Sequence, residues 1–412
     1  MKKNFLQEMQ DRGYLSQCTD LHQLGEICNK KPISGYIGFD CTANSLHVGS
    51  LLQIMILKLL QKHGHRPIVL LGGGTTLIGD PSGKDSTRKV LKPSEIKKNI
   101  KSIKKVFNKI LDTKNKKTSP IFVNNADWLT KLNYINFLRD TGSHFTINKM
   151  LSFDSVKLRL EREQSLSYME FNYMILQAYD FYQLFKKKNC ILQIGGSDQW
   201  GNIVNGVDLI RRKLQREAYG LTSPLITLAS GAKMGKTEKG AIWLNEDQLP
   251  AYDYWQFWRN TDDRDVRRFL NFFTEITTDK LNDIFQKEKN INNLKILLAN
   301  EATKILHGEK AAKMAELTAK DTFRGSRLSL NLPEIRIKSM EIEKGINILD
   351  LIANNNITSS KSEARRAIAN KGFKINDKVI EDEKKIIKSK DFEKKFFKLS
   401  YGKKKHYLIK II

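Results

Sequence analysis

Residues 34–71 contain the pattern that most restricts how this chain can fold. Residues 34–40 and 67–71 each have the pattern of a short strand, and glycines at 72–74 stop the second one. Between them, residues 49–63 carry apolar side chains almost all round a helix, which is typical of a helix buried between layers. A strand, a buried helix and a second strand predict one right-handed β-α-β unit with parallel strands.

The same alternation continues along the first half of the chain. Further strand patterns occur at 121–123, 191–194 and 225–228, and a helical pattern that reaches about residue 216 follows the second of these. We therefore predict an α/β fold, in which a Rossmann-like, doubly wound parallel sheet binds ligands at the carboxyl ends of its strands.

After about residue 249 the strand pattern disappears. Apolar residues recur at helical spacing through about residue 319, and residues 320–344 are mixed and polar. From about residue 345, two helical patterns precede short alternating strands, which indicates a small α+β unit. The predicted organisation is an α/β domain at 1–230, an α-helical domain at 231–325, a linker at 326–344 and a C-terminal domain at 345–412.

Charge and composition limit the partners and the location. The 412 residues include 71 Lys and Arg against 45 Asp and Glu, a formal net charge of +26 that suits a polyanion such as nucleic acid. No apolar stretch approaches the roughly 18 residues that span a bilayer, and residues 1–12 lack a signal-peptide pattern. The four cysteines form no C-x-x-C pair, which argues against a zinc site or a disulfide framework. We expect a cytoplasmic protein with no membrane partner and no protein-bound metal.

The segment after the first strand has the residues of a phosphate site. It leaves a strand at Asp40 and enters a helix near Gly49, where free backbone N–H groups favour phosphate. Thr42 and His47 add neutral donors that can follow negative charge on a phosphoryl oxygen. Gly49 has no Cβ, so a purine or ribose can pack against its backbone. A loop with a buried histidine is the simpler interpretation of His47 taken alone.

A second candidate segment, residues 231–237, is rich in glycine and lysine. It resembles a P-loop, but one residue too few separates its glycines. Residues 79–84 fail the same test, because an aspartate follows their lysine. A glycine-hinged loop that carries Lys233 and Lys236 can instead close over a triphosphate and stabilise a phosphoryl group in transfer. Taken alone, this segment would be an exposed basic turn.

These two segments resemble the signatures of class I aminoacyl-tRNA synthetases. The first signature is His47-Val48-Gly49-Ser50, and the second is Lys233-Met234-Gly235-Lys236-Thr237. More specific motifs accompany them in order and resemble bacterial tyrosyl-tRNA synthetases. They are Tyr36-x-Gly38-Phe39-Asp40, Gly79-Asp80-Pro81-Ser82-Gly83-Lys84, Tyr173-x-x-x-Gln177-x-x-Asp180 and Gly195-Gly196-Ser197-Asp198-Gln199-Trp200-Gly201-Asn202. The similarity runs essentially from end to end, and the C-terminal unit resembles the small RNA-binding domain of a ribosomal small-subunit protein.

The chain departs from the family pattern at three positions. Cys41 stands where family members often have Pro, and Ser50 stands where they often have a second His. Ser50 can donate one hydrogen bond but carries no positive charge, so we expect it to contribute less than His47. Gly235 replaces a Ser of the lysine loop, which indicates added flexibility.

The resemblance implies a tyrosine pocket, an ATP site and a catalytic group. Asp180 and Tyr36 would meet the phenolic hydroxyl, and Gln177 and Asp80 would receive the ammonium, assisted by the Tyr173 hydroxyl. Helical spacing puts three of these residues on one face, where an unpaired carboxylate would be costly, although a plain core seam is the simpler interpretation. Asp198 could equally cap a helix. The implied sets are Tyr36, Asp80, Tyr173, Gln177, Asp180 and Gln199 for tyrosine; Gly38, Asp40, His47, Gly49, Ser50, Gly196, Asp198 and Lys236 for ATP; and Thr42, His47, Lys233, Lys236 and Thr237 for catalysis.

The resemblance also implies the reaction and the partners. A homodimer would activate L-tyrosine with ATP and Mg²⁺ and transfer it to tRNA(Tyr), whose anticodon the helical domain at 231–325 would bind. Residues 128–151 offer the one apolar-polar stretch that suggests a dimer interface. Two alternatives remain open. A different adenylate-forming enzyme, such as a tryptophan-specific synthetase, would have no phenol to pair with Asp180 and Tyr36. A non-enzymatic RNA-binding protein would not need His47 and the two loop lysines.

Overall fold

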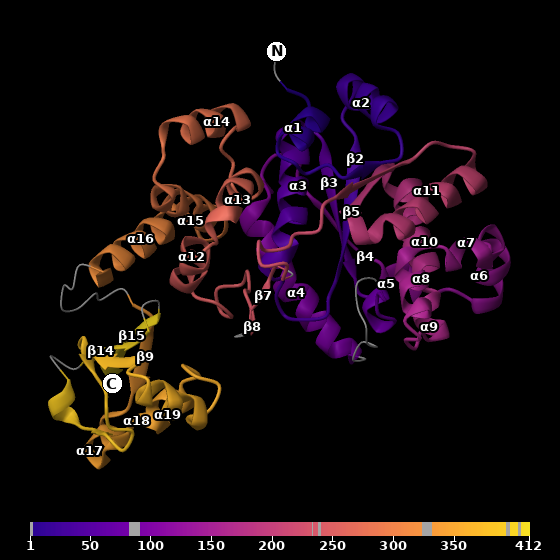
Figure 1. Ribbon diagram of the computed structural model, residues 1–412. Coiled ribbons are helices and arrows are strands. Elements are labelled where there is room, and N and C mark those ends of the chain that lie inside the picture. The colour runs from indigo at the N-terminus through magenta and orange to yellow at the C-terminus, as the bar shows by residue number, and fades with distance from the viewer. Residues whose placement is uncertain are drawn as a thin grey trace. The chain divides into compact units, whose positions relative to one another are not determined.

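The computed structural model describes residues 3–81, 91–232, 234–237, 240–323, 332–392, 396–402 and 405–412, with only the backbone at 154, 155, 236, 237 and 321–323. The chain divides into two compact units, Met1–Leu249 with Thr261–Leu294, and Pro250–Asn260 with Lys295–Ile412. Figure 1 labels most of the helices and strands of both units.

The first unit is built on a six-stranded sheet in the order β1-β6-β5-β2-β3-β4. The strands are β1 (Gln17–Cys18), β2 (Ser34–Asp40), β3 (Arg66–Gly72), β4 (Ile121–Asn124), β5 (Cys190–Gly196) and β6 (Tyr219–Ser223). Strands β2 to β6 pair in parallel, and β1 pairs antiparallel with β6. The chain passes from β2 to β3 and β4 on one side and then to β5 on the other side of β2. The predicted doubly wound parallel sheet is confirmed.

Most of the remaining residues of this unit are helical. The helices are α1 (Phe5–Asp11), α2 (Leu21–Lys30), α3 (Leu51–Lys62), α4 (Pro93–Ile110), α5 (Ala126–Leu129), α6 (Tyr134–Asp140), α7 (Ile147–Leu151), α8 (Asp154–Glu161), α9 (Tyr168–Phe171), α10 (Tyr173–Lys188), α11 (Trp200–Leu214), α13 (Val266–Phe273) and α14 (Thr278–Lys287). Short 3-10 turns occur at Val48–Ser50, Thr75–Leu77, Gly142–His144, Ser197–Gln199 and Asp263–Asp265. Helix α3 is buried along most of its length, as its apolar sequence predicts. In the described parts of the chain, no helix has the length and apolarity needed to cross a bilayer.

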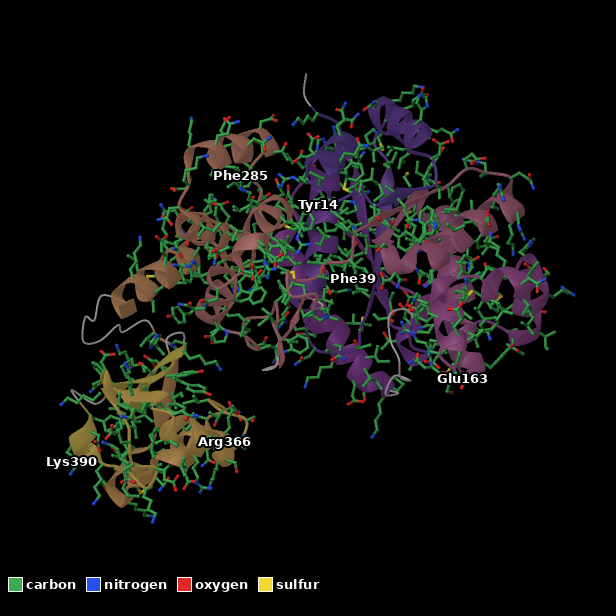
Figure 2. All side chains as sticks on the ribbon, viewed as in Figure 1. Tyr14, Phe39, Glu163, Phe285, Arg366 and Lys390 are labelled. Atoms are coloured by element: carbon green, nitrogen blue, oxygen red, sulfur yellow. The ribbon has the colours of Figure 1, made fainter. Side chains whose placement is uncertain are left out.

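Helices cover both faces of the sheet, as a parallel sheet requires. In Figure 1, α3 and α4 lie on one side of the strands and α10 and α11 on the other. The side chains of β2 alternate accordingly. Tyr36 packs against Phe181 of α10 with ring centroids 5.4 Å apart, whereas Phe39 packs against Phe107 of α4 at 4.9 Å. Phe39 therefore lies inside this unit, as the side-chain view in Figure 2 shows.

One predicted strand is wrong. Residues 225–228 lie outside the sheet, whose last strand along the chain is β6. Pro224 follows β6 and has no N–H to extend the ladder, and Leu225 is 51% exposed. The backbone instead folds back on itself, and the Leu228 N–H donates to the Ala232 carbonyl at 2.8 Å.

The second unit contains helices and a C-terminal α+β fold. Its helices before the C-terminal fold are α12 (Ala251–Arg259), most of α15 (Ile291–His307) and α16 (Glu309–Phe323). Together with α13 and α14 they confirm the helical character predicted for 249–319. Since the two compact units divide this region between them, a separate helical domain stays a prediction.

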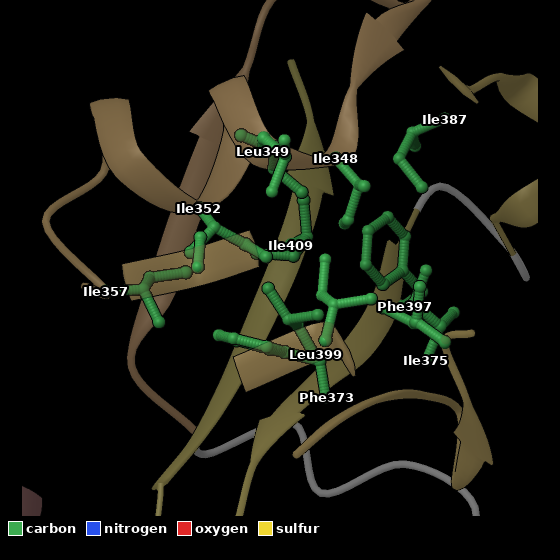
Figure 3. Packing of buried hydrophobic residues seen from close by; sticks show 14 of the residues in the cluster. Ile348, Leu349, Ile352, Ile357, Phe373, Ile375, Ile387, Phe397, Leu399 and Ile409 are labelled. Atoms are coloured by element: carbon green, nitrogen blue, oxygen red, sulfur yellow. The ribbon is translucent and has the colours of Figure 1, made fainter. Parts of the chain in front are cut away.

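The C-terminal fold has its own sheet and core. The elements are β9 (Glu334–Ile337), α17 (Ser339–Lys344), β10 (Ile346–Asn347), α18 (Ile348–Asn354), α19 (Lys361–Ala369), β11 (Phe373–Ile375), β12 (Lys378–Val379), β13 (Ile386–Ile387), β14 (Phe396–Tyr401) and β15 (Lys405–Ile411). Five strands form a sheet in the order β12-β11-β14-β15-β9. Ile352 of α18, Phe397 of β14 and Ile409 of β15 meet in a buried cluster drawn entirely from this fold (Figure 3). The predicted α+β unit is confirmed.

Part of the predicted linker belongs to this C-terminal fold. Strand β9 pairs in parallel with β15, the last strand of the chain. Ile337 of β9 and Ile342 of α17 are buried in the same core cluster. Residues 334–344 are therefore not a linker, and residues 326–331 of the predicted linker lie outside the described residues.

Candidate active site

A cavity of about 310 Å³ lies at the carboxyl ends of β2 and β5 in the first unit. The strand order reverses between these two strands, which is where an open α/β sheet leaves a crevice for a ligand. The ends of both strands, the start of α3, one face of α10 and the turn after β5 contribute to its wall. The cavity is thus where the predicted sheet was expected to bind its ligands.

Asp180 lines this cavity from α10 and is almost completely buried. Its Oδ2 accepts a hydrogen bond from Asn125 Nδ2 at 2.8 Å, and its Oδ1 accepts one from Trp128 Nε1 at 2.7 Å. Burial raises the pKa of Asp180 to about 7, although the two hydrogen bonds oppose this shift by stabilising the ionised form. The carboxyl group is therefore fixed in place and changes its charge near neutral pH.

Tyr36 of β2 contributes to the same cavity wall. Tyr36 is 1% exposed, and its hydroxyl has no hydrogen-bond partner among the described residues. Burial, followed by the nearby Asp180, raises the pKa of Tyr36 well above its usual range. A buried hydroxyl without a partner is costly. Together, Tyr36 and Asp180 fit a ligand hydroxyl that pairs with both of them.

A chain of hydrogen bonds holds further polar groups at the cavity. Gln199 Nε2 donates to Asp80 Oδ2 at 3.0 Å, and Asn202 Nδ2 donates to the side-chain oxygens of Gln199 and Gln177, each at 3.1 Å. The side-chain oxygens of Asp80 and Gln177 accept hydrogen bonds, so they can receive an ammonium group of a ligand.

Backbone forms the wall at the start of α3 and at the turn after β5. A Cβ on Gly49 would come within 2.7 Å of the His47 ring and of the Met234 carbonyl oxygen. A Cβ on Gly196 would come within 2.6 Å of Asp198 Oδ1. A side chain at either position would therefore clash with the protein itself, and the backbone of both glycines lines the cavity.

Comparisons with known proteins show the family of this chain. A family model described as tRNA synthetases class I (W and Y) matches residues 28–324, and one for the tyrosine–tRNA ligase SYY-like C-terminal domain matches residues 330–409. A tyrosine–tRNA ligase of Pelagibacter ubique is 62% identical over 408 residues, which cover 99% of both chains. The chain belongs to the tyrosine–tRNA ligase family of class I tRNA synthetases.

Other relatives extend the comparison. A tyrosine–tRNA ligase of Rickettsia conorii is 52% identical over 409 residues, which cover 99% of this chain and all of the relative. The crystal structure of a C-terminally truncated mitochondrial tyrosyl-tRNA synthetase of Aspergillus nidulans superimposes with a TM-score of 0.69 at 28% identity. The superposition covers 78% of this chain and 94% of the Aspergillus chain. These likenesses confirm the fold predicted for the family.

The fold brings most of the family's expected binding residues to one cavity. The residues that line it are Tyr36, Asp80, Tyr173, Gln177, Asp180 and Gln199 of the expected tyrosine set and Gly38, Asp40, Gly49, Ser50, Gly196 and Asp198 of the expected ATP set. Asp198 is not an N-cap residue, because Gly196 holds that position for the turn and Gln199 holds it for α11. The roles of these residues stay predictions.

The two expected catalytic residues whose side chains the structure describes do not line this cavity. His47 is not among the described lining residues, and its Nδ1 accepts a hydrogen bond from the Gly49 N–H at 3.1 Å. Thr42 is exposed and also lies outside the lining. Lys233 lies outside the described residues, as do the side chains of Lys236 and Thr237.

Sequence reasoning missed the residues that hold the site in shape. Asn125 and Trp128 bond Asp180, and Asn202 joins two glutamines, but the sequence assigns none of the three to the site. Trp128 was placed in a candidate interface, whereas it is 8% exposed and its indole N–H is bonded inside the site. For Asn202 a signal existed, because it ends the motif that contains Asp198.

Proposed function

We propose that this protein activates L-tyrosine with ATP and transfers it to tRNA(Tyr). The observation that supports this most is the buried pair of Tyr36 and Asp180 in the cavity wall. An unpartnered hydroxyl beside a fixed carboxyl suits a phenol, which can donate one hydrogen bond and accept another. An indole offers only one donor, so the pair favours tyrosine over tryptophan.

The first step needs positioning and charge stabilisation rather than an enzyme nucleophile. A carboxylate oxygen of tyrosine attacks the α-phosphorus of ATP, the bond to the β-phosphate bridge breaks, and pyrophosphate leaves with tyrosyl-adenylate as the other product. We assign the substrate ammonium to Asp80 and Gln177, and the adenosine to the backbone walls at Gly49 and Gly196. Mg²⁺ would enter with ATP and neutralise its phosphates. Among the described residues, no cluster of three or more His, Cys, Asp or Glu is placed to hold a metal ion.

In the same step, the two signature loops would act on the phosphates. We assign Thr42 and His47 to the departing pyrophosphate, with Lys233, Lys236 and Thr237 on its other side. In the second step, a terminal ribose hydroxyl of the tRNA attacks the adenylate carbonyl carbon and AMP leaves. This chemistry belongs in the cytoplasm, where tRNA and ATP are found.

Amino-acid-dependent exchange between labelled pyrophosphate and ATP tests the activation step. We expect exchange with tyrosine and at most traces with the other nineteen amino acids, because they lack the phenol. Exchange that depends on tryptophan instead would favour the tryptophan-specific alternative. A protein that exchanges with no amino acid would contradict the proposal.

The raised pKa of Asp180 makes a pH prediction. Because the ionised carboxylate is the better acceptor for a phenol, tyrosine affinity should rise with pH through about 7, the pKa of Asp180. Replacing Asn125 by Ala removes a hydrogen bond that lowers this pKa, so the midpoint should move to higher pH. Equilibrium dialysis of tyrosine between pH 5 and 8 measures the midpoint, with Asn205→Ala as a buried-amide control. An unchanged midpoint in Asn125→Ala would show that Asp180 does not control binding.

We assign the C-terminal fold to tRNA binding. Helix α19 exposes Arg365 and Arg366 beside buried Ala364 and Ile368. Figure 2 shows Arg366 and Lys390 on this part of the chain. Such a basic surface suits the phosphates of a folded RNA.

Deletion of residues 324–412 tests this assignment. Cutting at Lys344, the boundary that the sequence suggests, would leave β9 without its partner β15, so the longer deletion is the cleaner one. Tyrosine-dependent pyrophosphate exchange should persist, whereas tRNA charging should weaken most at low salt, where phosphate contacts contribute most. If the truncated protein charges tRNA as well as the full chain does, the C-terminal fold has no part in the reaction.

We also propose a homodimer, formed through an apolar face at residues 134–169. Helices α6 to α9 share a small core, and Tyr134 and Tyr168 join two of them by a hydroxyl–hydroxyl contact of 2.8 Å. Large apolar side chains stay exposed on this face, among them Ile135 at 68% and Ile147 at 59%. Exposed apolar surface of this extent is typical of an interface.

Sedimentation of an Ile135→Asp, Ile147→Asp double variant tests the interface. Two buried charges would cost several kcal/mol, so the variant should be monomeric where the wild type is dimeric. Met340→Asp, at an equally exposed apolar residue elsewhere, should sediment as the wild type does. A double variant that stays dimeric would place the interface on another face.

A further inference from the structure

Residues 242–245 pair with the first signature loop along a short antiparallel ladder in the first unit. The Val48 N–H donates to the Ile242 carbonyl at 2.8 Å, and the Leu244 N–H donates to the Leu46 carbonyl at 2.9 Å. Between these two bonds, His47 forms an antiparallel bridge with Trp243. The backbone on both sides of His47 is thus bonded to a segment that lies about 200 residues away in the chain.

The same segment continues directly from the second signature loop. Strands β7 (Lys236–Thr237) and β8 (Gly240–Ala241) pair antiparallel, and the Ile242 N–H then donates to the Gly235 carbonyl at 3.2 Å. A Cβ on Gly235 would come within 2.5 Å of His47 Nδ1 and 2.9 Å of the Gly49 nitrogen. The backbones of the two signature loops therefore touch, and residues 242–245 connect them.

Asn245 ends this segment and joins it to α4 by its side chain. Its N–H donates to Ser45 Oγ at 3.0 Å, and its Oδ1 accepts from the same hydroxyl at 3.0 Å. Its Nδ2 donates to Ser102 Oγ at 2.9 Å and to the Ser102 carbonyl at 3.3 Å. Asn245 is 6% exposed and Ser45 is 3% exposed, so water does not compete for these bonds.

The network fixes the pairing register at its far end. A strand can slip against its partner unless a turn or side chain specifies the pairing. Ser45 immediately precedes the three paired residues of the first loop, and Asn245 follows the three paired residues of the connecting segment. The reciprocal bonds between Ser45 and Asn245 therefore keep His47 opposite Trp243, and Ser102 holds this arrangement against a rigid helix.

We infer that Asn245 is a positioning residue for the activation step. It sets the distance between the loop of His47 and the loop of Lys233 and Lys236. Asn245 is not among the residues described as lining the cavity, so it acts through these loops and not on the substrates. This inference rests on the proposed function, because it assigns both loops to the phosphates of ATP. Misplacing a catalytic group by about 1 Å can cost about a hundredfold in rate.

Asn245→Ala tests the inference because it should affect kcat/KM for ATP and the affinity for tyrosine differently. Its kcat/KM for ATP in tyrosine-dependent exchange should fall about 10- to 100-fold, because both phosphate loops lose their fixed register. Tyrosine affinity, measured by equilibrium dialysis, should stay within about twofold of wild type, because Tyr36, Asp180 and their partners lie outside the network. A merely structural role would lower both parameters together with the melting temperature.

Two further variants sharpen the test. Asn245→Asp keeps the oxygen that accepts from the Ser45 hydroxyl, but it puts a second oxygen where Nδ2 donates to the Ser102 carbonyl, so kcat/KM for ATP should fall as it does in Asn245→Ala. Asn205→Ala removes another buried amide of the same unit, 3% exposed, and should behave as the wild type does. Ser45→Ala breaks the same reciprocal bonds from the other side, and its effect should not add to that of Asn245→Ala.

The outcomes distinguish this inference from the proposed function. If the wild type shows no tyrosine-dependent exchange, the proposed function fails first. If the wild type is active and Asn245→Ala keeps a normal kcat/KM for ATP, the positioning role is wrong. It is also wrong if Asn245→Ala loses tyrosine affinity to the same extent as kcat/KM for ATP. If Asn245→Ala does not fold, a normal kcat/KM for ATP in Ser45→Ala overturns the inference in the same way.

Discussion

Replacing Tyr36 by Phe should lower the ratio of tyrosine to phenylalanine activation about 10- to 100-fold. A site that bonds a substrate hydroxyl rejects the analogue lacking it by about 10⁴–10⁵, a scale taken from enzymes of this family rather than from this structure. Phenylalanine leaves the buried Tyr36 hydroxyl without a partner, and the substitution removes this penalty. The ratio of kcat/KM values in pyrophosphate exchange measures the effect.

Tyr14→Phe provides the matched control for this substitution. Tyr14 is also 1% exposed, but its hydroxyl donates to the Phe272 carbonyl at 2.7 Å, and Tyr14 is not among the described residues of the cavity wall. Tyr14→Phe should lower the free energy of unfolding by about 1 kcal/mol and leave the specificity ratio unchanged. An unchanged ratio in Tyr36→Phe would mean that Tyr36 only packs against Phe181.

Replacing Lys236 by Ala should slow adenylate formation about a hundredfold or more, while tyrosine binding stays nearly unchanged. The ammonium group would act on the phosphates mainly as the transition state forms, and one such charged contact contributes a few kcal/mol. Single-turnover formation of tyrosyl-adenylate separates this rate from binding. Lys131→Ala, at an exposed lysine outside both loops, should react as the wild type does. A rate near wild type in Lys236→Ala would remove this lysine from the mechanism.

The sheet could be predicted because its signals are local. Strand β3 carries a continuous apolar run and α3 is apolar almost all round, so the sequence within these segments specifies their type. Strand β6 is buried but has no such run, and the sequence predicts no strand there. The strand predicted at 225–228 is wrong because Pro224 has no N–H and ends the hydrogen-bond ladder before this apolar run begins. Leu225 of the run lines the cavity instead. The linker was misjudged because β9 pairs with β15, and such distant pairing leaves no local pattern.

The candidate site, like the fold, could be predicted only in part from the sequence. Helical spacing alone places Tyr173, Gln177 and Asp180 on one face of α10, and all three line the cavity. Neither spacing nor composition indicates that Asn125 and Trp128 bond Asp180, because those contacts form only when β4 and α5 reach α10 in the fold. The high cost of a buried carboxylate predicted that partners must exist, without saying which residues they are.

Charging of unfractionated bacterial tRNA with labelled tyrosine, tryptophan and phenylalanine tests the central claim most directly. The full chain with ATP and Mg²⁺ should attach tyrosine to tRNA in an acid-precipitable form, and the attachment should stop when ATP is withheld. Tryptophan and phenylalanine should give no more than background. Charging with tryptophan, or no charging with any of the three, would contradict the assignment of Tyr36 and Asp180 to a tyrosine substrate.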